Sequence, residues 1–144
     1  MESRLSTILK DKGNAVYSVS PETHIHKCAE KMSELGVGAL LVLQDKKLVG
    51  ILSERDIICK VVSPNLNIED LIASDIMSTD LVTVPPTMTV TEAMRLVTEK
   101  RFRHLPVIEN GQLVGIISIG DLTRCAMLAQ KNEISTLTDY IHRS

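Results

Sequence analysis

The stretch LVGILSERD at residues 48–56 recurs 65 residues later as LVGIISIGD at residues 113–121. Between residues 19 and 57, further positions match the second copy at the same offset, such as Pro21 with Pro86. A repeat at a fixed offset indicates one structural unit and its duplicate. A unit of about 60 residues buries only a limited core by itself, so we expect the two copies to pack on each other.

Each copy begins with a short strand and a helix. The runs at residues 16–19 and 81–84 are typical of short strands, and a proline follows each of them closely. Apolar residues then recur at helical spacing, from Ile25 in the first copy and from Val90 in the second. This spacing predicts a helix with one apolar face in each copy.

Each copy continues with a hairpin and a last helix. The apolar runs at 39–43 and 48–52 flank one turn, and those at 105–108 and 113–117 flank Asn110-Gly111. Asn-Gly between two apolar runs strongly favours a hairpin. A last helix is expected to begin near Ser53 and near Ser118. The predicted unit is therefore β-α-β-β-α with a mixed three-stranded sheet, and the fold class is α+β with two such units packed in pseudo-two-fold symmetry.

The repeat divides the chain at residue 66. Residues 1–66 are predicted to hold a lead-in helix at 3–11 and the first copy, and residues 67–144 the second copy with a C-terminal helix. A linker is expected at 63–74. In the tail, Ile134, Leu137 and Ile141 lie at helical spacing, which fits either a cover for the domain's own core or a dimer contact.

Composition argues against several functional classes. The net charge is −2, whereas bulk nucleic-acid binding needs a positive field against phosphate. Aromatic residues make up 2 % of the chain, which is unlike a base-stacking surface. The apolar runs are far shorter than the ~18 residues of a membrane span, and the N-terminus has no pattern of a secretory signal. Three widely spaced cysteines fit a reducing compartment. The default expectation is the cytoplasm, and an organelle is the alternative.

The Ser-x-x-Asp pairs, Ser53 with Asp56 and Ser118 with Asp121, lie where a helix follows a strand. One interpretation is a capping box, in which serine and aspartate only satisfy backbone N–H groups. The other is a ligand site, because a helix N-terminus attracts phosphate and one carboxylate can accept both hydroxyls of a ribose. The sequence offers no nucleophile motif, phosphate loop or metal-ligand cluster, so catalytic residues and metal ligands are not expected.

Two tandem copies, each with Gly-hydrophobic-x-Ser-x-x-Asp after a hairpin, resemble a pair of cystathionine-β-synthase (CBS) domains, also called a Bateman module. The stretch RHLPVI at 103–108 also resembles the family's second strand, and the whole chain is similar to small stand-alone CBS-pair proteins. The resemblance implies a regulatory protein, not an enzyme, that senses AMP, ADP, ATP, NAD or S-adenosylmethionine in the cleft between the two copies. It also implies a homodimer that acts on an unidentified protein partner.

The same resemblance implies the roles of individual residues. Aspartates of the motifs would bind ribose, serines ribose or phosphate, and basic residues of the second copy phosphate, while strand residues line the adenine. In the first copy, small residues replace the basic ones, so Arg55 is the candidate substitute and the two sites are expected to be unequal. The candidate ligand-binding residues are Ser53, Arg55, Asp56, Thr83, Val84, Arg103, His104, Pro106, Ile116, Ser118 and Asp121. The alternative is a structural dimerisation or interaction protein without a ligand.

Overall fold

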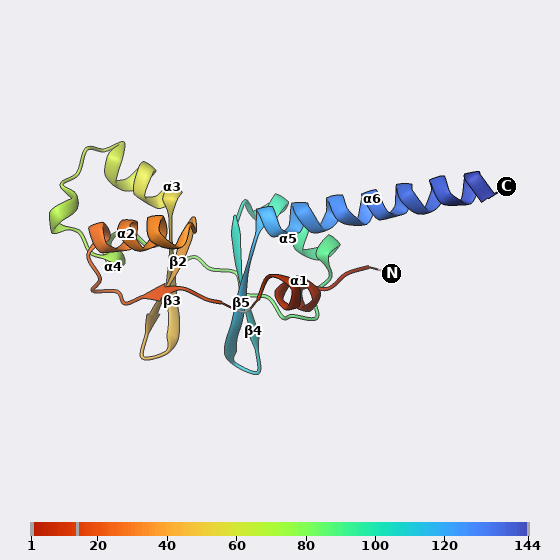
Figure 1. Ribbon diagram of the computed structural model, residues 1–144. Helices are drawn as coiled ribbons and strands as arrows, with labels where there is room; N and C mark the ends of the chain where they lie inside the picture. The colour runs from red at the N-terminus through yellow and green to blue at the C-terminus, as the bar shows by residue number, and fades with distance from the viewer. Residues whose placement is uncertain (1, 14, 144) are drawn as a thin grey trace. The chain divides into compact units, whose positions relative to one another are not determined.

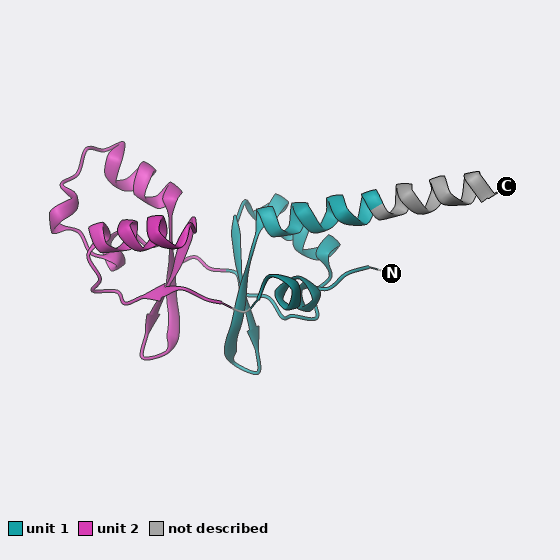
Figure 2. Cartoon of the chain, viewed as in Figure 1, with its two compact units in different colours: residues 1–14, 82–144 teal, residues 15–81 magenta. Residues whose placement is uncertain are grey.

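The chain forms two compact units, which Figure 2 distinguishes by colour. The computed structural model describes residues 2–13 and 15–143, with side chains up to residue 131. Unit 1 comprises residues 1–14 and 82–144, and unit 2 comprises residues 15–81. Both units mix helices with strands, which confirms the α+β class. The tail residues Ile134, Leu137 and Ile141 lie outside the described residues.

Unit 2 has the predicted three-stranded sheet, visible in Figure 1. Its strand order is β1-β2-β3, with β1 parallel to β2 and β2 antiparallel to β3. Helix α2 buries the apolar stripe that the sequence predicts, with Ile25, Cys28 and Met32 in one core cluster. The elements of this unit are β1 (Ser18–Val19), α2 (Ile25–Leu35), β2 (Ala39–Gln44), β3 (Lys47–Ser53), α3 (Glu54–Ile57), the π-helical turn η1 (Ile58–Val62), the 3-10 turn η2 (Ile68–Asp70) and α4 (Ala73–Ile76).

Unit 1 contains the second copy of the repeat together with the N-terminal helix. The predicted Asn-Gly turn is present, since Asn110 and Gly111 have φ values of 53° and 76°, as a type I′ turn requires. The elements are α1 (Leu5–Lys12), α5 (Val90–Lys100), β4 (His104–Glu109), β5 (Gln112–Ser118) and α6 (Ile119–Arg143).

The strand predicted at residues 81–84 is reduced to a single parallel bridge between Val84 and Val107. In unit 2, the N–H of Leu41 donates to the carbonyl of Tyr17 and extends the pairing of β1. The residue equivalent to Leu41 in the second copy is Pro106, which has no N–H to donate. The prediction was therefore wrong about the length of this strand, because it ignored the ladder position of the proline.

The helix that precedes each copy packs within the other copy's unit. Helix α1 precedes the first copy, yet its Leu5, Ile8 and Leu9 lie in the core of unit 1. A Cβ on Gly115 of β5 would lie 2.5 Å from the Cδ2 atom of Leu9. This close approach explains why a residue without a side chain suits that position.

The predicted linker at 63–74 is not free of structure. It contains η2 and the beginning of α4, and the side chain of Asn67 accepts a hydrogen bond of 3.1 Å from the N–H of Glu69. Met77, directly after α4, lies against Gly50 of β3, where a Cβ would be 2.5 Å from its sulfur. The segment thus covers the sheet of unit 2 as α1 covers that of unit 1.

Candidate functional site

Both serine–aspartate pairs form complete capping boxes. The N–H of Ser53 donates to Asp56 Oδ2 at 2.9 Å, and the N–H of Asp56 donates to Ser53 Oγ at 3.1 Å. The N–H groups of Ser118 and Asp121 make the same two bonds at 2.8 and 3.1 Å. The capping interpretation is thus confirmed as a description of the contacts. It accounts for one oxygen of each carboxylate and leaves the other oxygen for further partners.

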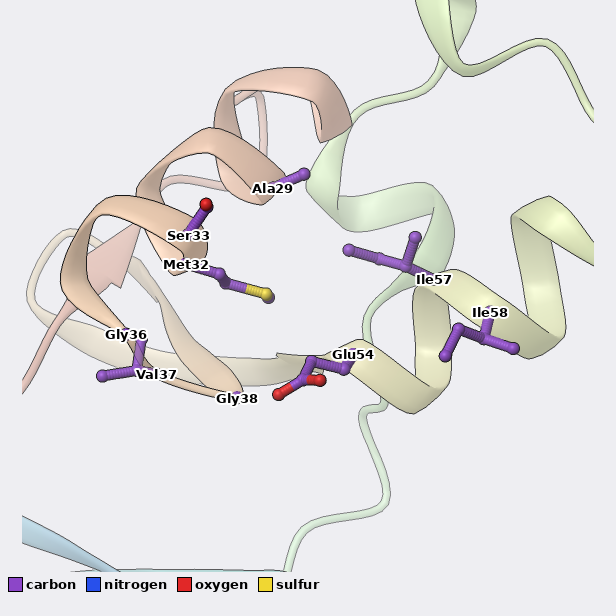
Figure 3. Close-up of a pocket in the computed structure, with 9 residues that line it drawn as sticks. All are labelled: Ala29, Met32, Ser33, Gly36, Val37, Gly38, Glu54, Ile57 and Ile58. Carbon is purple, nitrogen blue, oxygen red and sulfur yellow. The ribbon is translucent and has the colours of Figure 1, made fainter.

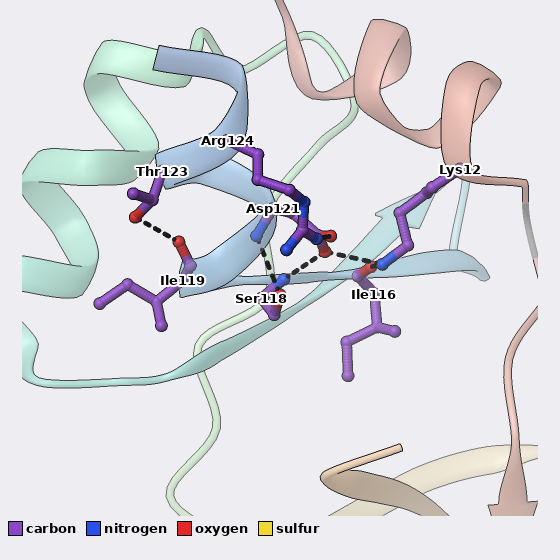
Figure 4. Close-up of polar contacts among 7 residues, drawn as sticks. All are labelled: Lys12, Ile116, Ser118, Ile119, Asp121, Thr123 and Arg124. Atoms are coloured by element: carbon purple, nitrogen blue, oxygen red, sulfur yellow. Dashed lines mark hydrogen bonds and ion pairs between the residues drawn. The ribbon is translucent and has the colours of Figure 1, made fainter. Parts of the chain in front are cut away.

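In unit 1, two cations converge on Asp121, as Figure 4 shows. Lys12 Nζ lies 2.7 Å from Asp121 Oδ2, and Arg124 Nη2 lies 2.6 Å from Asp121 Oδ1. The same lysine nitrogen donates to the carbonyl oxygen of Ile116 at 3.0 Å. Asp121 is only 7 % exposed, so these ion pairs lie partly out of water and are screened less than surface pairs.

The surroundings of Asp121 favour its charged form. Burial by itself pushes the pKa of this carboxyl up, but hydrogen bonds from Lys12 and Ser118 and the charge of Lys12 act against it. Their combined effect holds the pKa of Asp121 below its ordinary value. The carboxylate is therefore an ionised acceptor at neutral pH.

Asp56 of unit 2 has a related but different environment. Its Oδ1 accepts a hydrogen bond of 2.9 Å from the hydroxyl of Ser78 and lies 3.1 Å from Lys60 Nζ. Lys60 also donates to the carbonyl oxygen of Ile76 at 2.9 Å. The segment before the second copy thus brings a neutral hydroxyl to Asp56, whereas α1 brings an ammonium group to Asp121.

The structure places the other predicted residues of unit 1 at different depths. His104 begins β4 and is paired in the ladder with Ser118. Val84 and Pro106 are buried, and the N–H of Val84 donates to the carbonyl of Pro106 at 3.0 Å. Arg103 is exposed, and its carbonyl accepts from the N–H at the start of α6.

The remaining candidates lie nearer the surface. Thr83 is exposed before the Val84 bridge, and Ile116 is half-buried in β5 opposite Pro106. Arg55 is exposed on α3 of unit 2, beside the buried Asp56. Of the candidates in unit 1, Ser118, Asp121 and the carbonyl oxygen of Ile116 are connected by hydrogen bonds, with Lys12 as the link to Ile116.

Sequence reasoning missed four residues that contact the two aspartates. Lys60 lies four residues after Asp56, and Arg124 three residues after Asp121, and both spacings place side chains on one helix face. That signal was available in the sequence. For Lys12 and Ser78 the sequence carries no such signal, because α1 and the segment after α4 reach the aspartates only through tertiary packing.

Each unit contains a groove near its motif. In unit 1, a groove of about 640 Å³ lies between α1 and α6, and its lining includes Lys12, Asp121 and Arg124. In unit 2, a groove of about 450 Å³ lies between α2 and α3, and Figure 3 shows its mainly apolar lining. At the positions equivalent to Val37 and Gly38 of this lining, the second copy has Phe102 and Arg103. The second copy thus has larger side chains and an additional positive charge at these two positions.

The described part of the chain contains neither a cluster of three or more potential metal ligands nor a helix that is long and apolar enough to cross a membrane.

A comparison with protein families identifies both copies. The family described as CBS domain matches residues 13–63 and again residues 73–127. The protein YhcV of Bacillus subtilis, a CBS domain-containing protein, is 30% identical over 140 residues, which are 97% of this chain and 99% of YhcV. The protein MK0525 of Methanopyrus kandleri is 39% identical over 109 residues, 74% of this chain, but the match spans only 56% of MK0525.

Solved structures are similar over most of the chain. The CBS domain NE2398 superposes with a TM-score of 0.83 at 36% identity and covers 88% of this chain and 99% of its own. CBSX2, solved in complex with AMP, has a TM-score of 0.67 at 26% identity and covers 81% of this chain and 91% of its own. The resemblance inferred from the repeated motifs is thereby confirmed.

Proposed function

The chain belongs to the CBS domain family, and we propose that it is a regulatory module that binds an adenosine-containing nucleotide and thereby modulates a partner protein. The candidate ligands are AMP, ADP, ATP, NAD and S-adenosylmethionine. AMP has the most direct support, because the similar protein CBSX2 was solved with AMP bound. The proposed role is binding and signalling, without a catalytic step.

The burial of the two motif carboxylates carries this proposal. Among the described residues, Asp56 and Asp121 are the charged residues that are buried, at 8 % and 7 % exposure. Capping does not require such burial. The exposed Asp75 accepts a hydrogen bond of 3.0 Å from the N–H of Ile72 and so caps α4 in the same way. Burial of a carboxylate carries a desolvation cost, which the exposed Asp75 avoids while it accepts the same capping bond. The occurrence of a buried carboxylate at equivalent places in both copies therefore favours a role beyond capping.

A ribose fits this chemistry. Its two neighbouring hydroxyls are hydrogen-bond donors, and a carboxylate offers two acceptor oxygens. Hydrogen bonds to a charged group contribute about 1.5–3 kcal/mol each. We propose that Asp121 binds the ribose in unit 1, with Ser118 as an additional donor, and that Asp56 and Ser53 do so in unit 2. The proposal keeps Arg103 and His104 near the phosphates, and Thr83, Val84, Pro106 and Ile116 near the base.

Isothermal titration calorimetry with AMP, ATP, NAD and S-adenosylmethionine tests the proposal. At least one of the four ligands should give a saturable heat. In a thermal melt at 100 times its Kd, that ligand should add about 2.7 kcal/mol of stability. Absence of binding by all four ligands would contradict the proposal.

A matched pair of variants separates ligand binding from capping. Asp121→Asn keeps an oxygen for the capping bond but removes the charge and one acceptor, so ligand stabilisation should fall by more than about 1 kcal/mol. Asp75→Asn makes the same change at an exposed capping residue and should leave the ligand response unchanged. Equal ligand stabilisation of the two variants would assign Asp121 to capping alone.

The second candidate function is a structural dimerisation or interaction protein without a ligand. The complete capping boxes and the partners of both aspartates within the chain favour it, because each carboxylate oxygen already accepts a hydrogen bond from another residue. Light scattering would then show a stable homodimer whose mass and melting temperature are the same with and without nucleotide. The nucleotide-binding proposal also includes a homodimer, so the response to nucleotide is what distinguishes the two.

A further inference from the structure

We propose that Lys12 is a specificity-determining residue of unit 1, an internal competitor that makes the site at Asp121 select phosphorylated nucleosides over unphosphorylated ones. This inference rests on the proposed function and adds a residue that the motif does not contain. Lys12 belongs to α1, more than a hundred residues before the aspartate that it contacts.

Lys12 occupies the acceptors that a ligand would use. Its ammonium group lies 2.7 Å from Asp121 Oδ2 and 3.0 Å from the carbonyl oxygen of Ile116. A ribose hydroxyl is also a donor and would need the same carboxylate lone pairs. The ammonium group and a ribose hydroxyl therefore cannot both form a full hydrogen bond to Asp121 Oδ2, and ligand binding requires Lys12 to move.

Lys12 is able to move, and the groove gives it somewhere to go. The lysine side chain is 33 % exposed, and its flexible stem carries a compact charge. Lys12 and Asp121 both line the groove between α1 and α6, whose volume of about 640 Å³ lies within the usual range of small-molecule sites. Arg124 lines the same groove and is 70 % exposed.

The displaced ammonium group needs a new anionic partner. A nucleotide supplies one, because its phosphate oxygens can accept from Lys12 while its ribose takes the carboxylate. A nucleoside has no phosphate, so the Lys12–Asp121 pair is lost without replacement. Loss of this ion pair therefore weakens the binding of nucleosides, whereas nucleotides replace the pair with a contact between Lys12 and phosphate.

Unit 2 arranges its partners differently. There, the segment before the second copy supplies the hydroxyl of Ser78, at 2.9 Å from Asp56 Oδ1. The ammonium group that approaches Asp56 belongs to Lys60, which lies four residues after the aspartate and 3.1 Å from the same oxygen. The helix that precedes the copy therefore supplies the lysine in unit 1, and the inference is limited to Lys12 and unit 1.

An NMR titration of the full-length protein with adenosine and with AMP tests the inference. The backbone amides of Ser118 and Gly120 report binding at unit 1 separately from unit 2. The variants are Lys12→Met, which removes the ammonium group, and Lys10→Met, which removes the same charge from an exposed position of α1. Circular dichroism checks the fold, and Lys12→Gln is the second variant in case the methionine disturbs α1.

We expect Lys12→Met to bind adenosine about tenfold more tightly than the wild type, a factor that corresponds to 1.4 kcal/mol. Its affinity for AMP should stay the same or fall, so that the preference for AMP over adenosine drops at least about tenfold. Lys10→Met should keep the wild-type preference. An unchanged preference in both Lys12 variants would overturn the role of Lys12. If neither compound binds to any form of the protein, the role of Lys12 is overturned, and the calorimetry with ATP, NAD and S-adenosylmethionine decides whether the proposed function fails as well.

Discussion

The contact between α1 and β5 can be tested by adding a single methyl group. Gly115 of β5 is buried, and a Cβ there would lie 2.5 Å from Leu9 Cδ2 and 3.1 Å from Leu9 Cδ1. Carbon atoms normally approach no closer than about 3.5 Å. Leu9 is 5 % exposed and lies in the core of unit 1, so its side chain has little room to rotate away. The substitution Gly115→Ala should therefore be destabilising.

Two opposing terms set the size of the effect. Overpacking of a core costs about 1–3 kcal/mol. Replacing glycine by alanine also restricts the unfolded chain, which stabilises the fold by about 0.4–1 kcal/mol. We expect a net loss of about 1–2 kcal/mol in the free energy of unfolding, which corresponds to a melting temperature lower by roughly 3–6 °C.

A double-mutant cycle shows whether Leu9 is the cause. Leu9→Ala alone should cost about 2–5 kcal/mol, but it also removes the methyl groups that clash with a Cβ at position 115. In the double variant the overpacking disappears, so the two effects should differ from additivity by about 1–2 kcal/mol. Urea denaturation of the four proteins measures this coupling. Additive effects within about 0.5 kcal/mol would refute the proposed packing of α1 on β5.

Gly120→Ala is the matched control for Gly115→Ala. A Cβ at Gly120 would lie 3.4 Å from Arg124 Nη1 and 3.6 Å from Ser118 Oγ, which leaves room for a methyl group. Gly120 lies in the first turn of α6, where alanine is the better helix former. This variant should match or exceed the wild type in stability, by up to about 1 kcal/mol.

Two further predictions concern ionisable groups. The pKa of Asp121 is lower in the folded than in the unfolded chain, so its contribution to stability is complete above about pH 4 and is lost as the pH falls through the folded pKa. In Asp121→Asn, the urea midpoint should therefore fall less steeply as the pH is lowered through this range. An unchanged decrease of the midpoint would assign the acid sensitivity to other groups. Burial raises the pKa of the Cys28 thiol, whereas Cys59 is exposed and Cys125 half-buried, so a thiol reagent at pH 8 should modify Cys59 first and Cys28 last. Cys59→Ser should remove the fast phase of that reaction, and its persistence would contradict the assignment.

Much of the local structure could be predicted from the sequence. The Asn110-Gly111 turn, the apolar face of α2 and the Ser-x-x-Asp capping boxes all form as their patterns indicate. Each of these patterns depends on residues only a few positions apart, so their spacing along the chain is also their spacing in the structure. The strand predicted before Pro85 is reduced to a single bridge because the missing donor belongs to Pro106 on another strand.

The repeat, the α+β class and the family of this protein were determined by the sequence itself, since they depend on periodicity and on short motifs that recur in order. Only the tertiary structure decided which helix covers which sheet, and hence which side chains reach the buried carboxylates. Lys12 and Asp121 are separated by 109 positions, and no pattern along the chain relates them. They meet because the apolar face of α1 is buried in the core of the second copy's unit, and burial of apolar surface is a non-directional force that sequence spacing does not encode.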